Sequence, residues 1–149
     1  MGCLLKSIFS LIIVLLSAFL VGCQLNQVET MALLDENIVE VNLSKSDGFD
    51  EMNLDILHTF SDEKSIKQFE KAISTAQKQM EKVDVPQPEY DVMITYESEN
   101  DRQLPTHAIH LWLGKEDEKA MFMFLGDDEV YFTTKQITKK LRILIPSER

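Results

Sequence analysis

Two histidines three positions apart, His107 and His110, could together ligate a metal ion. Imidazole nitrogens are common zinc ligands. The residues around them are typical of a β-strand, in which positions three apart point to opposite faces. The two rings therefore cannot converge on one ion, and we expect partly buried or surface histidines here. The third histidine, His58, stands alone in the sequence.

Sulfur and carboxylate groups offer two further sets of metal ligands. Met121 and Met123 share one face of an expected strand, with Met93 on another strand, and thioethers suit copper. The same spacing is ordinary core filling, because methionine packs irregular gaps well. The acidic runs 47–51 and 127–129 could ligate calcium but lack the alternating acidic loop that ends in a distant glutamate. We expect no metal and no other cofactor.

The N-terminus has the order of a secretory signal. Lys6 precedes an apolar run over residues 8–20. The run ends in Leu20-Val21-Gly22-Cys23, which resembles the lipobox of bacterial lipoproteins. This resemblance implies cleavage between Gly22 and Cys23 and a diacylglyceryl group on the Cys23 thiol. We expect a mature chain anchored to the outer, extracytoplasmic face of the cell membrane; an uncleaved membrane helix is the alternative.

Charge and motif content exclude several partners and activities. The formal net charge is −10, and an acidic chain is repelled by nucleic acid and by anionic lipid, so attachment requires the covalent anchor. No serine lies in a Gly-x-Ser-x-Gly elbow, and the five glycines form no phosphate loop. Carboxylates are so frequent that no glycosidase pair stands out. These absences favour a protein that is not an enzyme.

Hydrophobic periodicity predicts the elements of the exported part. Strands are expected over residues 38–43, 52–60, 90–96, 106–113, 119–125 and 129–133, because apolar or β-branched residues run or alternate there between turn signals. A helix that Ser61 or Asp62 caps carries an apolar stripe from Ile66 to Met80. A second helix is expected over residues 135–144.

Strands joined by short turns favour an antiparallel sheet, and two amphipathic helices need an apolar face to cover. The predicted fold class is therefore α+β: two layers, with an antiparallel sheet of about five or six strands and both helices on one face. We expect a signal peptide over residues 1–22, a tether over residues 23–37, and a single domain over residues 38–149.

Four segments of the mature chain form a recognisable pattern: the helix 69–76, the Pro88-Glu89-Tyr90-Asp91-Val92 and Leu111-Trp112-Leu113 strands, and Val130-Tyr131-Phe132 leading into the 137–141 helix. In these segments the chain resembles a known family, the small lipoproteins of Gram-positive, Bacillus-like bacteria that carry a YhfM-like domain. It implies no activity and no functional residues.

The function expected on these grounds is a non-enzymatic, membrane-anchored binding or interaction domain, whose surface includes the acidic loop 97–103. Its partner would be an envelope protein or a small ligand. The alternative is a small envelope enzyme or a metal-handling lipoprotein.

Overall fold

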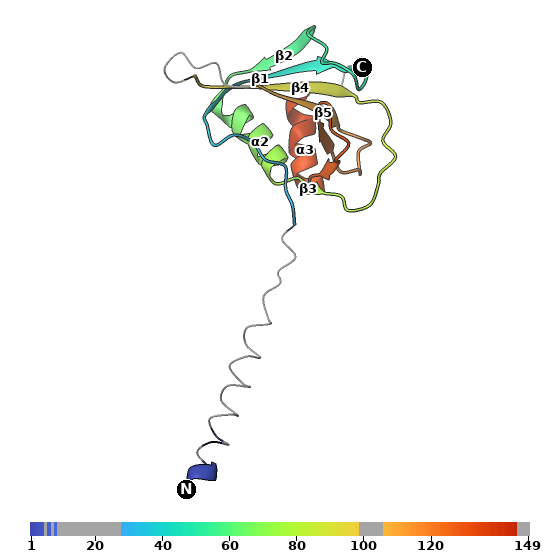
Figure 1. Cartoon of the computed structure of the whole chain (residues 1–149). Coiled ribbons are helices and arrows are strands. Elements are labelled where there is room, and N and C mark those ends of the chain that lie inside the picture. The colour runs from blue at the N-terminus through green and yellow to red at the C-terminus, as the bar shows by residue number, and fades with distance from the viewer. Residues whose placement is uncertain (5, 7, 9–27, 99–105, 146–149) are drawn as a thin grey trace.

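The computed structural model describes residues 1–4, 6, 8, 28–98 and 106–145 (Figure 1). Gly22, Cys23 and most of the 97–103 loop lie outside the described residues. Among the residues described, no helix is long and apolar enough to cross a membrane.

Seven antiparallel strands form one sheet, in the order β2-β1-β4-β5-β6-β7-β3. The central strands come from the apolar alternating segments, whose inward side chains are fully buried. The strands are β1 (Ile38–Lys45), β2 (Ile56–Phe60), β3 (Gln77–Lys78), β4 (Tyr90–Tyr96), β5 (His107–Trp112), β6 (Met121–Phe124) and β7 (Tyr131–Phe132).

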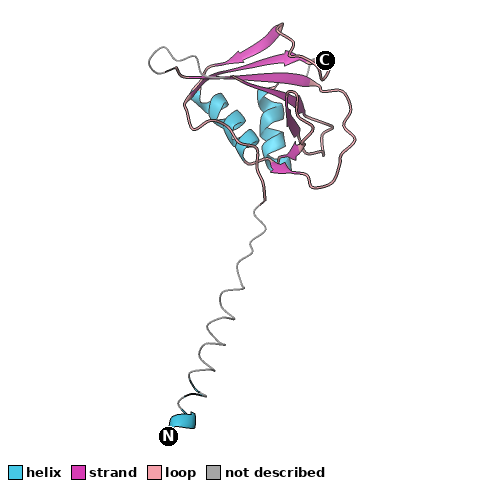
Figure 2. Ribbon diagram, in the orientation of Figure 1, coloured by secondary structure: helices cyan, strands magenta, loops and turns pink. Residues whose placement is uncertain are grey.

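Two helices, α2 (Glu63–Ser74) and α3 (Lys135–Leu144), lie side by side against one face of the sheet (Figures 1 and 2). Asp62 and Thr134 accept hydrogen bonds from first-turn amides and so begin the two helices. The main core fills the space between the helices and the sheet. The α+β prediction, with an antiparallel sheet covered by helices on one face, is confirmed.

The first helix is shorter than its apolar stripe predicted. It ends at Ser74, the chain turns at Thr75 and Ala76, and Gln77–Lys78 then pair with β7 as the seventh strand. Met80, expected on the buried stripe, is 93% exposed. The helical spacing of Met80 does not place it in the helix, because the pairing of Gln77–Lys78 with β7 ends the helix before that position.

Residues 30–34, which we expected within a tether, pack on the folded domain instead. Met31 is buried, and its amide donates to the Ala76 carbonyl oxygen. The Leu34 amide donates to the Tyr96 hydroxyl. An apolar residue such as Met31 gains free energy by leaving water, which favours a packed segment over an extended one.

A charged cluster joins β3, β7 and the segment before β1. Lys78 pairs with Glu29 and Glu129, and the Tyr131 hydroxyl donates to Glu129 over 2.9 Å. Burial, and then the hydrogen bond to the Glu129 carboxylate, raise the pKa of Tyr131 to about 12. Lys78 and Tyr131 together lower the pKa of Glu129.

The raised pKa of Tyr131 predicts a loss of stability at high pH. A folded-state pKa above the ordinary value of 10.0 contributes stability that is complete below pH 10 and is lost as the pH rises toward about 12. Tyr131→Phe should therefore show a smaller fall in the free energy of unfolding between pH 10 and 12. Urea titrations at a series of pH values measure this. If the free energy of unfolding falls equally with pH in the two proteins, the raised pKa of Tyr131 is contradicted.

Candidate functional site

A row of three buried polar residues crosses the sheet on the face away from the helices. Ser44 on β1 lies opposite Asp91 on β4, and Asp91 lies opposite His110 on β5. All three are buried, and most of the other buried residues of their strands are apolar. Burying polar groups costs free energy unless they are hydrogen-bonded, so the partners of this row are informative.

Asp91 and His110 form a hydrogen-bonded pair that is completely shielded from solvent. His110 Nδ1 lies 2.8 Å from Asp91 Oδ1, and both side chains are 0% exposed. The other carboxylate oxygen, Oδ2, accepts the amide of Asn53 over 2.9 Å. An ionised carboxylate can only accept, so Asp91 fixes the tautomer in which His110 Nδ1 carries the proton.

The second ring nitrogen of His110, Nε2, meets a backbone carbonyl group. Nε2 lies 3.4 Å from the carbonyl oxygen of Phe49, which can only accept, so this long, weak contact is made by an Nε2–H group. The rings of Phe49 and Trp112 pack around the imidazole, with centroids 5.9 and 6.2 Å from its own. A histidine whose ring is oriented by a carboxylate becomes a candidate general base when Nε2 leaves that carbonyl oxygen and gives up its proton.

The residues above Nε2 belong to a cover segment, residues 46–55, which has no helix or strand. Ser44 Oγ donates to the Asn53 carbonyl oxygen at one end of the segment. Ser46 Oγ lies within hydrogen-bond reach of Gly48, whose φ of 145° suits glycine. Phe49 at its middle is 40% exposed. The contact to His110 Nε2 therefore comes from a segment that belongs to no strand.

Beside Phe49 lies a cavity of about 560 Å³, the Phe49 cavity. Phe49 packs on His110 and also lines this cavity. The other apolar walls are Met80, Val83, Val85, Met123 and Val130, and the charged ones are Lys78, Glu81, Lys82, Asp84, Asp127, Asp128 and Glu129. The lining thus mixes apolar and charged side chains, and most of the charged ones are acidic.

The histidines singled out from the sequence have separate environments. His107 points to the helix side of the sheet, where its Nδ1 lies 2.6 Å from the Tyr96 hydroxyl and burial lowers its pKa. His110 points to the other face, as strand alternation predicted. His58 is exposed on β2. Across the described part of the chain, no three His, Cys, Asp or Glu side chains gather as a metal site.

The other candidate metal ligands lie in surroundings that give them structural roles. Met121 and Met123 are buried in a small apolar cluster with Trp112 and Val130. Asp127 accepts the amides of Asp128 and Glu129 and so shapes the turn after β6. Sequence reasoning placed Asp91 in an expected strand but did not single it out as a functional residue.

A protein-family model described as YhfM protein matches residues 35–149, which contain every strand and both helices described above. The chain belongs to the YhfM family. No curated protein matches this YhfM chain.

The YhfM chain is similar to the solved structure of a thioesterase-like protein from Clostridium sporogenes. The TM-score is 0.58 and the identity 15%, over 75% of this chain and 97% of that chain. At this identity the likeness shows the fold.

The expectation of a non-enzymatic binding domain, and with it the exclusion of an enzyme, is corrected by this comparison: the YhfM chain shares the fold of a thioesterase-like protein. The exclusion was wrong in its physical reasoning as well. The missing serine elbow and phosphate loop rule out two kinds of catalysis, whereas a histidine that activates water needs neither motif.

Proposed function

We propose that the YhfM domain is a hydrolase of acyl thioesters that uses His110 as its general base. The observation that carries the proposal is the buried Asp91–His110 pair. Asp91 binds Nδ1 of the ring, and Nε2 lies 3.4 Å from the Phe49 carbonyl oxygen of the cover segment. The fold, shared with a thioesterase-like protein, supports the same reaction class.

In the proposed reaction, the cover segment opens and a water molecule takes the place of the Phe49 carbonyl oxygen beside Nε2. His110 removes a proton as the water oxygen attacks the acyl carbon. The carbon–sulfur bond then breaks, and His110 returns the proton to the departing sulfur, giving a carboxylic acid and a thiol. Asp91 orients the ring and stabilises its positive charge between the two proton transfers.

The Phe49 cavity is the proposed binding place of the acyl group. Its apolar walls would bury an acyl chain, which contributes about 0.8 kcal/mol for each methylene removed from water. The acidic side chains that line the cavity would repel a thiol carrier with several phosphates. The expected substrates therefore have a neutral or cationic thiol, and acyl-coenzyme A should react poorly.

Thiol release from acyl-N-acetylcysteamine and acyl-coenzyme A substrates of increasing chain length tests this function. The neutral series should be hydrolysed, and His110→Gln should abolish the rate. His58→Gln, the same exchange at an exposed ring, is the matched control and should keep it. Absence of hydrolysis with every acyl chain, or full activity of His110→Gln, would refute the proposal.

We also propose that this domain is held at the outer face of the cell membrane of a Gram-positive bacterium by a diacylglyceryl group on Cys23. The support is the charged-then-apolar order of residues 1–22 and the Leu20-Val21-Gly22-Cys23 sequence at its end. Two acyl chains anchor a protein stably where one does not.

Mass spectrometry of the native N-terminus tests the anchor. The expected first residue is Cys23 with a lipid mass on its sulfur, and Cys23→Ser should remove that mass. A native chain that begins at Met1 with an unmodified thiol would refute the anchor and would leave the proposed activity untouched.

A further inference from the structure

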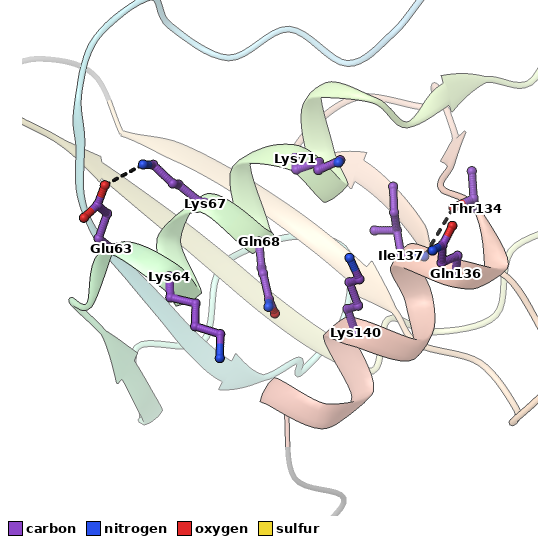
Figure 3. Close-up of a pocket in the computed structure, with 9 residues that line it drawn as sticks. All are labelled: Glu63, Lys64, Lys67, Gln68, Lys71, Thr134, Gln136, Ile137 and Lys140. Carbon is purple, nitrogen blue, oxygen red and sulfur yellow. Dashed lines mark hydrogen bonds and ion pairs between the residues drawn. The ribbon is translucent and has the colours of Figure 1, made fainter.

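A cationic groove runs between the two helices, on their solvent side (Figure 3). Its volume is about 680 Å³. Figure 3 shows Gln68 of α2 and Lys140 of α3 reaching into it from facing helices. We call it the lysine groove; the residues that line it are Glu63, Lys64, Lys67, Gln68, Lys71, Thr134, Gln136, Ile137 and Lys140.

Four lysines and a single acid line this groove in a chain whose net charge is −10. Lys64, Lys67 and Lys71 recur at helical spacing along α2, so they share one face. Glu63 pairs with Lys67 and raises the pKa of that ammonium group. Lys64, Lys71 and Lys140 make no ion pair with the residues that the structure describes.

The net charge of the whole chain does not cancel this local field. Charges at the surface interact over a Debye length of about 8 Å at physiological ionic strength, so acids on the far side of the sheet are screened from the groove. A group with negative charge is therefore attracted here even though the protein as a whole is acidic. The exposed lysine stems and Ile137 add apolar surface beside the cations.

The described part of the chain before β1 begins near the C-terminal end of α2. Residues 29–31 lie beside residues 76–78, directly after the C-terminal end of α2, through the bonds Met31 N–H to Ala76 O and Lys78 N–H to Glu29 O. Val28 follows Cys23 by five positions, so it can lie at most ~18 Å from that residue.

We propose that the lysine groove docks on the headgroups of anionic phospholipids in the membrane that holds the chain. The proposal rests on the proposed anchor at Cys23, which keeps the helical side of the domain within reach of the headgroup layer. The groove supplies the charge complementary to a phosphodiester, and the short connection limits how far the domain can turn away. Docking would fix the orientation of the domain, with the Phe49 cavity on the opposite face of the sheet and open to the medium.

The test uses the full, membrane-extracted protein in uncharged maltoside micelles, observed through the amide NMR signals of α2 and α3. Micelles doped with phosphatidylglycerol should shift these signals saturably, whereas phosphatidylcholine and inorganic phosphate should not. The triple variant K64Q/K71Q/K140Q should raise the half-saturating phosphatidylglycerol concentration on the order of 100-fold, because each lysine near an anionic surface contributes about fivefold.

The control is the triple variant K115Q/K119Q/K139Q, which has the same net charge and changes lysines that do not line the groove. It should titrate as the unaltered protein does. Equal responses of the two triple variants, or of the two lipids, would overturn the proposal. Saturation by inorganic phosphate at the same concentration would assign the groove to free phosphate instead. The titration reports on the groove alone, so its failure is distinct from a failure of the anchor, which the N-terminal mass reveals.

Discussion

Asp91→Asn is expected to lower kcat for the proposed thioester hydrolysis by about 10²–10⁴-fold, with KM nearly unchanged. The wild-type carboxylate accepts two hydrogen bonds, one from His110 Nδ1 and one from the Asn53 amide. An asparagine has one acceptor oxygen, so its NH₂ group must face one of these two donors. If the NH₂ group faces His110, Nδ1 must accept and the neutral ring keeps its proton on Nε2, which removes the base.

The alternative rotamer of the introduced asparagine would oppose two N–H groups at Asn53 and loosen the cover segment, so a stability measurement must accompany the kinetics. Urea unfolding of the variant identifies that case. Asp55→Asn makes the same exchange at an exposed carboxylate of the cover segment and should leave kcat unchanged. Wild-type kcat in Asp91→Asn would show that Asp91 only secures residues 46–55 and does not orient a base.

The sequence predicted those elements whose signals are local. The α3 helix runs over residues 135–144 as expected, because Thr134 caps it and no strand competes for its last turn. The β4 and β5 segments alternate clearly and were found. The end of α2 and strand β3 were missed, since the apolar stripe continues to Met80 while pairing with β7 ends the helix at Ser74.

The Asp91–His110 pair could not be predicted from one strand at a time. Alternation separated His110 from His107, but the partner of His110 depends on the register between β4 and β5, across the loop that joins them. A usable signal was present. Asp91 and His110 are each polar residues within largely apolar strands, and a buried polar residue requires a partner on the neighbouring strand.

The lysine groove shows a similar division between local and tertiary information. Lys64, Lys67 and Lys71 can be placed on one face of a helix from their spacing alone. The contribution of Lys140 depends on how α3 packs beside α2. Net charge is a poor guide to such a surface, because it sums residues that lie on opposite sides of the sheet.

Phe69→Ala is expected to lower the free energy of unfolding by about 3–5 kcal/mol, a large part of the ~5–15 kcal/mol of a typical domain. Phe69 is 0% exposed on the inner face of α2, and its ring lies 5.1 Å from that of Phe60 on β2. Removing the ring leaves a cavity between the helix and the edge of the sheet. Urea unfolding followed by circular dichroism measures the change.

Phe49→Ala removes the same atoms from a ring that is 40% exposed on the cover segment, and it should cost much less stability. Equal losses for the two variants would contradict the assignment of Phe69 to the core. The comparison also separates the two roles proposed for the two faces of the sheet. Phe69 holds the helix that carries three of the groove lysines, so its loss should weaken phosphatidylglycerol binding as α2 loosens. Phe49 covers His110 on the other face, so its loss should alter hydrolysis and leave the lysine groove intact.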